Sequence, residues 1–208
     1  MDFSRTSSSD VAPRLDGVGS RTTILLIRHA HTDAVGRYLA GRTPGVALSA
    51  VGRAQVKDLL TLLCGRTIDA VYSGPLERAR ETATPLAASR GLPVHVRGDL
   101  DEVDFGAWTG RTFDELALLP EWKTYNTSRS TAVVPGGEDA ATATTRIVRA
   151  LAVIRSRHPC GTAAVVTHAE LIRYAMLHAL GWSPDRFSQV EIAPASVHLL
   201  RHGPAVAG

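Results

Sequence analysis

The sequence predicts an α/β protein, a three-layer α/β/α sandwich with a mostly parallel central sheet. Short apolar runs of strand length alternate along the chain with longer segments whose apolar residues recur at helical spacing. The apolar runs are continuous rather than interrupted by polar residues, which is typical of parallel strands buried on both faces. Right-handed crossovers through the intervening helices would place those helices in layers on either side of the sheet.

The first half of the chain is expected to supply two strands and two helices. Residues 23–27 form the first buried strand, and residues 49–63 form a helix whose first residue, a serine, is its N-cap. Residues 68–72 form the second strand. Pro75 is expected at the first position of the next helix, where its missing N–H costs nothing. Pro85 is expected to kink or divide that helix.

The second half of the chain continues the alternation after a loop-rich middle. Helices are expected over about 139–157, where apolar residues lie at helical spacing, and over 171–180, which ends before a glycine. The remaining strands are expected at 94–96, 163–166, 190–192 and 197–200, the last two as a pair near an edge of the sheet.

A single domain is expected over residues 22–208, preceded by a flexible leader over residues 1–21. The chain has 208 residues, of which 44% are hydrophobic and 21% charged, and this fits one core. The leader is rich in Ser, Asp, Gly and Arg, and it has neither an apolar period nor the apolar centre of a signal peptide. No stretch has the roughly 20 consecutive apolar residues of a membrane-spanning helix. A cytoplasmic protein without a membrane partner is therefore expected.

The charged residues and the cysteines argue against several classes of function. The formal net charge is +3, but the basic residues are scattered, so no nucleic-acid partner is expected. Two of the 23 basic residues are lysines, and a chain so rich in Arg and Ala is typical of a GC-rich bacterial genome. Cys64 and Cys160 stand far apart without a C-x-x-C pattern, so neither a disulfide framework nor a structural zinc site is expected.

Polar side chains gather where the predicted parallel strands end, which is where open α/β sheets bind ligands. Arg28 and His29 follow the first strand, and Arg78 lies one turn into the helix after the second. Glu102 comes shortly after the short third strand, and His168 closely follows the next one. We therefore expect two histidines, two arginines and a carboxylate to meet in one crevice.

Five sequence blocks surround these residues in order: "LLIRHAHT", "YSGPLERARETA", "LDEVDFGAWTG", "VPGGE" and "VVTHAELIR". Together they resemble the histidine phosphatase superfamily, also called phosphoglycerate mutase-like proteins. The resemblance covers roughly residues 22 to 202 and implies the phosphoglycerate mutase-like fold. It also implies a phosphomonoesterase of the histidine acid phosphatase type that uses neither a metal nor a cofactor.

The resemblance assigns roles by position. His29 would be the nucleophile that accepts a phosphoryl group, and Glu102 would donate a proton to the leaving group. The residues that would bind the phosphoryl oxygens are Arg28, Arg78 and His168. Further substrate contacts are expected at Thr32, Arg129 and Ala169.

The chemistry of phosphoryl transfer suits these residue types. The reaction depends mainly on positioning and on stabilising the charge of the equatorial oxygens. Arginine forks supply bidentate, charge-assisted hydrogen bonds at any working pH. Histidine suits the covalent role because its neutral form is populated near neutral pH, and a backbone carbonyl can hold its second ring nitrogen. A carboxylic acid beside the leaving group typically contributes about 10² to 10⁴-fold in rate, and as a carboxylate it can later activate water.

Three features depart from the family pattern. Ala30 replaces the glycine of Arg-His-Gly, which a negative φ would tolerate. Ala169-Glu170 replaces the Gly-Gly after the second histidine and brings a charge near the pocket. The asparagine expected a few residues after the first histidine is absent, with Val35 nearby. These departures bear on substrate fit more than on the chemistry.

Four other polar residues have open roles. His31 is expected either at the rim or in contact with substrate, and Arg80 is expected in solvent or in an ion pair. Glu138 lies near a helix start, where it would complement the helix dipole or line the pocket wall. Asn126 lies with Arg129 in a loop that could cover the crevice.

The expected function is hydrolysis of a small phosphorylated metabolite through a phosphohistidine, and three alternatives stay open. A phosphoglycerate mutase would use the same intermediate, but the segment between Glu102 and His168 is short for the insertion by which mutases clamp substrate. His29-x-His31 also resembles the metal-binding opening of amidohydrolases, although 208 residues are few for eight βα units. The third alternative is a non-catalytic phosphate-binding module. The physiological substrate and the oligomeric state, a homodimer included, are not predicted.

Overall fold

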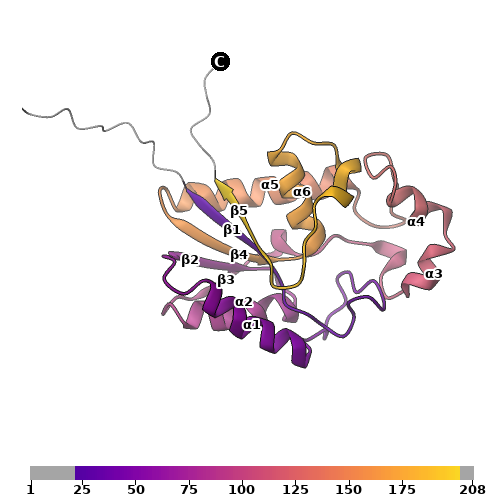
Figure 1. Cartoon of the computed structure of the whole chain (residues 1–208). Coiled ribbons are helices and arrows are strands. Elements are labelled where there is room, and N and C mark those ends of the chain that lie inside the picture. The colour runs from indigo at the N-terminus through magenta and orange to yellow at the C-terminus, as the bar shows by residue number, and fades with distance from the viewer. Residues whose placement is uncertain (1–21, 202–208) are drawn as a thin grey trace, which may run out of the picture.

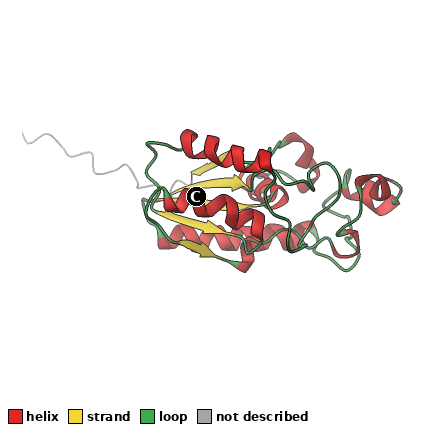
Figure 2. Ribbon diagram, turned by 90° about the horizontal axis from the view of Figure 1, so that it is seen from below, coloured by secondary structure: helices red, strands yellow, loops and turns green. Residues whose placement is uncertain are grey.

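The computed structural model describes residues 22–201, and its centre is a five-stranded sheet with helices on both faces (Figure 1; Figure 2). The strand order is β3-β2-β4-β1-β5. Four strands are parallel to their neighbours, and β5 runs antiparallel to β1 at one edge. The strands are β1 Thr23–Arg28, β2 Ala70–Ser73, β3 Val94–Val96, β4 Thr162–Thr167 and β5 Val197–Arg201.

Six α-helices and three short 3₁₀ helices lie within residues 22–201. Side-chain caps begin two long helices: the Ser49 hydroxyl accepts from the N–H of Gly52 at α1, and the Asp139 carboxylate accepts from the N–H of Thr142 at α5. The α-helices are α1 Ala50–Leu62, α2 Glu77–Ala88, α3 Phe113–Ala117, α4 Pro120–Tyr125, α5 Ala140–Arg157 and α6 Ala169–Ala179. The 3₁₀ helices are η1 Gly98–Leu100, η2 Gly106–Trp108 and η3 Pro184–Gln189.

Alternate residues of the central strands face two separate hydrophobic clusters. Leu25 and Ile27 of β1 pack with apolar side chains of α1 and α2, whereas Ile24 and Leu26 pack with those of α5 and α6. In Figure 1, α5 and α6 lie above the sheet and α1 and α2 lie below it. The strand β1 is thus buried on both faces, as its continuous apolar run predicts. The predicted α/β/α sandwich is confirmed, as are most of its elements, with small shifts at their ends.

One predicted strand is absent. Residues 190–192 follow η3 and do not pair with the sheet. Their carbonyl groups instead accept hydrogen bonds from arginines: Arg173 Nε donates to Val190 (2.9 Å) and Arg28 Nη1 donates to Ile192 (2.7 Å). The apolar β-branched residues of this segment predicted a strand. The sequence does not show that arginine side chains donate hydrogen bonds to these carbonyl groups.

The predicted position of Pro75 is wrong, and α2 is not divided at Pro85. Pro75 precedes the helix, whose N-cap is Leu76. Pro85 lies inside α2 but does not divide it. Ala83 and Leu86, on either side of Pro85, are fully buried against the sheet, and this packing holds the helix together across the missing N–H.

The loop-rich middle contains the two short helices α3 and α4, which extend to the right of the sheet in Figure 1. A capping box at Thr112 and Glu115 starts α3, but so short a helix leaves little periodic signal in a sequence. Within residues 22–201, no helix combines the length and apolarity needed to cross a bilayer. The leader expected at residues 1–21 lies outside the described residues, as do 202–208, so the division into leader and domain stays a prediction.

Candidate active site

The carboxyl ends of the parallel strands bring the main predicted site residues to one edge of the sheet. Arg28 is the last residue of β1, and His29 follows it. Arg78 lies in the first turn of α2, directly after β2. Glu102 follows η1 on the chain leaving β3, and His168 is the N-cap of α6, immediately after β4. The topology thus converts residues scattered over the sequence into one cluster.

His29 is fixed in one tautomer by the backbone next to it. Its Nδ1 lies 2.8 Å from the carbonyl oxygen of Ala30, so Nδ1 carries the proton and Nε2 is left as the basic atom. Burial, followed by the charge of Arg78, lowers the pKa of His29 from 6.5 to about 3. The imidazole is therefore neutral at neutral pH, and its Nε2 lone pair is free to attack.

Arg28 and Arg78 are each anchored through one nitrogen. Arg28 Nη1 donates to the carbonyl of Ile192 (2.7 Å), and Arg78 Nη2 donates to the carbonyl of Gly41 (2.6 Å). Among the described residues, Arg28 Nε and Arg78 Nη1 are buried and have no hydrogen-bond partner. Burial also lowers the pKa of both guanidinium groups. Because buried donors without partners are costly, the two arginines are suited to bind the oxygens of an anion.

His168 lies beside His29, with the ring centroids 5.1 Å apart and the ring planes inclined by 61°. The His168 side chain is fully buried, and neither of its ring nitrogens has a hydrogen-bond partner within residues 22–201. Burial, followed by the neighbouring His29 and Arg78, lowers the pKa of His168 well below its usual value. The neutral ring can therefore donate one N–H to a bound phosphoryl oxygen.

Glu102 places a carboxyl group next to His168, with Oε2 3.8 Å from Nδ1. Burial, followed by the negative charge of Glu170, raises the pKa of Glu102 from 4.5 to about 7. The N–H of Val103, which donates to Oε1 (2.8 Å), opposes that shift. At neutral pH both protonation states of this carboxyl are populated, so it can give a proton and take one back.

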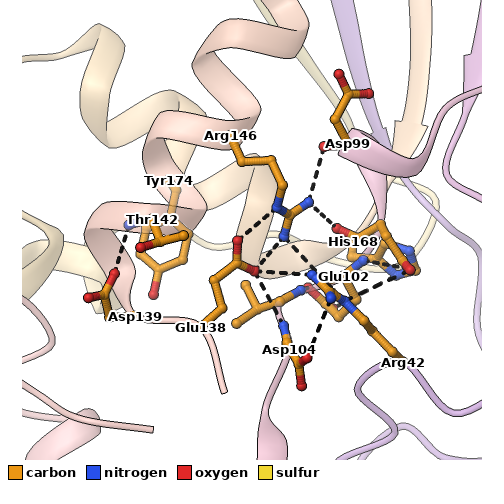
Figure 3. A network of polar contacts seen from close by, with 12 residues as sticks. Arg42, Asp99, Glu102, Asp104, Glu138, Asp139, Thr142, Arg146, His168 and Tyr174 are labelled. Atoms are coloured by element: carbon orange, nitrogen blue, oxygen red, sulfur yellow. Dashed lines mark hydrogen bonds and ion pairs between the residues drawn. The ribbon is translucent and has the colours of Figure 1, made fainter. Parts of the chain in front are cut away.

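Three charged residues, Arg42, Glu138 and Arg146, hold the backbone at Glu102, and we call them the Glu138 clamp (Figure 3). Arg42 Nε and Arg146 Nη2 both donate to the Glu102 carbonyl oxygen, at 2.7 and 3.3 Å. The Glu138 carboxylate bridges the two guanidinium groups, at 3.2 Å from Arg42 and 2.6 Å from Arg146. Glu138 lies directly before Asp139, the N-cap of α5, so it is near a helix start as expected, but it does not line the active-site pocket.

The site opens into a pocket of about 280 Å³. The remaining predicted substrate contacts all line this pocket: Thr32, Arg129 and Ala169. Asn126 lines it too, whereas His31 does not, because its Nδ1 lies 2.9 Å from the hydroxyl of the cap residue Ser49. Arg80 is exposed on the outer side of α2.

Two of the three departures from the family pattern, Ala30 and Ala169-Glu170, fit their surroundings. Ala30 does not have a positive φ, and its methyl group packs with Leu48 and Val56. Glu170 faces the pocket, and its carboxylate pairs with two arginines, Arg129 and Arg173. The additional methyl group and the additional charge are therefore both accommodated.

The sequence did not reveal the residues that support the site. Arg42 and Arg146 hold Glu102, and Thr82 accepts a hydrogen bond from the N–H of Ala30 (3.0 Å) through its hydroxyl. The block "VPGGE", which contains Glu138, was the available signal for the clamp, whereas any single arginine carries little information in an arginine-rich chain. Among the described residues, no group of three or more His, Cys, Asp and Glu side chains could hold a metal ion.

A five-stranded α/β/α sheet with two histidines, two arginines and a carboxyl group at its carboxyl edge is typical of the phosphoglycerate mutase-like class of proteins. The family profile of the histidine phosphatase superfamily, branch 1, matches residues 24–206. The chain belongs to this superfamily. The alternative of an amidohydrolase on an eight-unit barrel is therefore wrong.

Relatives of known name include phosphatases. A bifunctional protein of Mycobacterium tuberculosis is 36% identical over 179 residues, which are 84% of this chain and 49% of that protein, so the chain spans about half of its length. Phosphoserine phosphatase 1 of Hydrogenobacter thermophilus is 31% identical over 168 residues, 79% of each chain. The structure of the mycobacterial glucosyl-3-phosphoglycerate phosphatase has a TM-score of 0.79 at 25% identity and covers 87% of this chain and 90% of its own.

Proposed function

We propose that this chain hydrolyses a small phosphomonoester without a metal, through a phosphohistidine formed on His29. The observation that carries this proposal is a set of buried nitrogen atoms on Arg28, Arg78 and His168 that have no hydrogen-bond partner within residues 22–201. Such atoms are suited to surround a phosphoryl dianion. The membership in the superfamily and the phosphatases among its relatives support the same reaction.

In the first half of the reaction, Nε2 of His29 attacks phosphorus and a P–N bond forms as the P–O bond to the leaving group breaks. Nδ1 keeps its proton and donates it in a hydrogen bond to the carbonyl oxygen of Ala30, which keeps the ring oriented. Glu102 gives its proton to the leaving oxygen, so an alcohol departs rather than an alkoxide. The bound dianion raises the pKa of Glu102 further, because like charges disfavour ionisation, and this keeps the acid protonated until it is needed.

In the second half, the Glu102 carboxylate takes a proton from water as the water oxygen attacks phosphorus. The P–N bond breaks, inorganic phosphate leaves, and His29 returns to its neutral form. Arg28 and Arg78 stabilise the equatorial oxygens in both steps. Ala169 follows the N-cap of α6, so its backbone N–H is one of the donors that a helix start leaves unpaired, and it is suited to bind a phosphoryl oxygen.

Hydrolysis is favoured over mutase activity because the insertion between Glu102 and α5 contains little more than the short helices α3 and α4. Assay of 2- and 3-phosphoglycerate interconversion separates the two functions. Rapid interconversion would replace the phosphatase proposal with the mutase. A phosphate-binding module would instead bind phosphate without turnover.

The central test compares the wild type, His29→Ala and His95→Ala on p-nitrophenyl phosphate in the presence of EDTA. His95 is exposed on β3 and does not line the pocket, so its variant controls for the loss of a histidine outside the site. We expect metal-free turnover that vanadate inhibits, that His29→Ala abolishes and that His95→Ala retains. Rapid quenching with labelled substrate should trap acid-labile phosphate on the wild type. Unchanged turnover in His29→Ala would refute the assignment of His29 as the nucleophile.

A further inference from the structure

The pocket has two chemically different parts. Its inner end holds the nucleophile and the cations that would bind a phosphoryl group. Its outer wall comes from the loop after β1, from α3 and α4, and from η3. The outer wall, as we use the term here, is formed by Val35, Tyr38, Leu39, Phe113, Trp122 and Phe187. A leaving group attached to the phosphate would therefore lie against mainly aromatic and aliphatic side chains.

Beyond the inner end, the charged side chains that line the pocket within residues 22–201 are Arg129 and Glu170. They form an ion pair with one another, and the second oxygen of Glu170 accepts from Arg173 Nη1 (2.5 Å). Arg129 Nε donates to the carbonyl of Tyr125 (3.2 Å). Each charge that a leaving group could meet is therefore already paired within the protein.

The Arg129 guanidinium is also covered on its faces. Its central carbon lies 4.0 Å from the ring centroid of Tyr125 and 3.7 Å from that of Phe187, and the residue is 2% exposed. A substrate carboxylate could reach this cation only by displacing Glu170 or by sharing one guanidinium with it. Either arrangement brings two carboxylates together in a buried place, and such like-charge contacts strongly disfavour binding.

A substrate ammonium group meets the converse obstacle. Glu170 is the carboxylate that could receive it, but both oxygens of Glu170 are occupied by arginines. An ammonium group inserted there would lie beside two guanidinium groups. An uncharged ring meets no such conflict and buries apolar area against the outer wall.

We infer that this pocket selects phosphomonoesters whose leaving group is uncharged and carries an aromatic or apolar ring. We assign Glu170 as the residue that excludes anionic leaving groups, because it neutralises Arg129. The inference rests on the proposed function in taking the inner end of the pocket as the phosphate site. It deepens that function by naming the substrate class.

The test measures equilibrium binding, so that selectivity is read independently of turnover. In a His29→Ala background, the dissociation constants of 1-naphthyl phosphate and 3-phosphoglycerate are measured with and without Glu170→Gln. We expect naphthyl phosphate to bind more tightly when Glu170 is present. Glu170→Gln should shift the ratio of the two constants by about tenfold or more toward 3-phosphoglycerate, since one freed charged hydrogen bond is sufficient for that change.

Two further variants guard against a merely structural effect. Arg129→Gln combined with Glu170→Gln removes both charges, so the ratio should return toward its original value. The double variant can also be compared directly with the His29→Ala protein if the single variant, which has an unpaired buried cation, fails to fold. Leu118→Ala, at a position 79% exposed and outside the pocket lining, should leave the ratio unchanged.

Several outcomes would overturn the inference. These are tighter binding of 3-phosphoglycerate when Glu170 is present, a ratio that Glu170→Gln does not move, an equal shift in the double variant, or no binding of either ester. Failure of the proposed function looks different. In that case the binding selectivity holds, but the enzyme with an intact His29 hydrolyses neither ester.

Discussion

Replacement of Glu102 by glutamine should change the pH dependence of folding in a direction set by burial. A carboxyl group whose pKa is higher in the folded than in the unfolded state binds its proton more tightly when folded. Glu102 therefore contributes stability that is fully present below pH 4.5 and is lost as the pH rises through about 7. Glutamine has the shape of the protonated acid and does not titrate.

The size of the effect follows from the pKa. A rise from 4.5 to about 7 corresponds to about 3 kcal/mol of folding free energy between the protonated and the ionised site. The free energy of unfolding of Glu102→Gln, relative to the wild type, should thus increase by about 3 kcal/mol between pH 4.5 and pH 8.5. Any constant effect of the amide cancels in this comparison. Titration of His29 and His168 does not complicate this free energy difference, because burial keeps both rings neutral across most of this pH range.

Urea denaturation of both proteins at a series of pH values measures the difference. Asp58→Asn removes an exposed carboxylate from α1 and is the matched control for the loss of one carboxylate. If the free energy difference between Glu102→Gln and the wild type does not change with pH, then Glu102 is solvated in the folded protein. Its assignment as a general acid with a raised pKa would then be untenable.

Three further outcomes are expected. The pH profile of kcat/KM, after allowance for the ionisation of the substrate phosphate, should fall on the acid side with the pKa of His29 at about 3 and on the alkaline side with that of Glu102 at about 7. Glu138→Gln weakens the clamp behind Glu102, so it should move the alkaline limb of this pH profile and lower kcat. Asp139→Asn retains the cap of α5 and should do neither. Identical pH profiles for Glu138→Gln and the wild type would contradict a positioning role for the clamp. Gly52→Ala should destabilise the protein by about 2 kcal/mol or more in thermal unfolding, because a Cβ there would lie 2.1 Å from a backbone oxygen of the loop after β1.

The sequence predicted what depends on periodicity and on the ends of strands. The continuous apolar run of β1 requires burial on both faces, and a parallel sheet then brings the ends of β1, β2 and β4 to one edge. His29 and His168 were found for that reason. Residues 190–192 were misjudged because long-range hydrogen bonds from Arg28 and Arg173 decide their conformation.

The supporting residues could not be predicted from sequence. Arg42 and Arg146 meet at Glu102 only through tertiary packing, and neither residue differs in its sequence context from the many other arginines of the chain. The pairing of Glu170 with Arg129 depends on how the loop after α4, which contains Arg129, packs against the start of α6. The sequence marks Glu170 as a departure from a pattern, but the neutralisation of its charge is visible only in the structure.

A single physical cause, burial, gives both reacting groups the protonation state that the proposed reaction needs. In water between pH 4.5 and 6.5, a glutamate is mostly ionised and a histidine mostly protonated, so the acid has no proton and the nucleophile has no lone pair. Burial disfavours the charged form of each group, and it therefore raises the pKa of Glu102 to about 7 and lowers that of His29 to about 3. Between these values the protonated acid and the neutral imidazole coexist. Arg28 and Arg78 lower the pKa of His29 further, but they also lower the pKa of Glu102 and so oppose the effect of burial there. The position of Glu102 relative to the two arginines therefore determines how far the acid retains its proton, and the Glu138 clamp helps to fix that position.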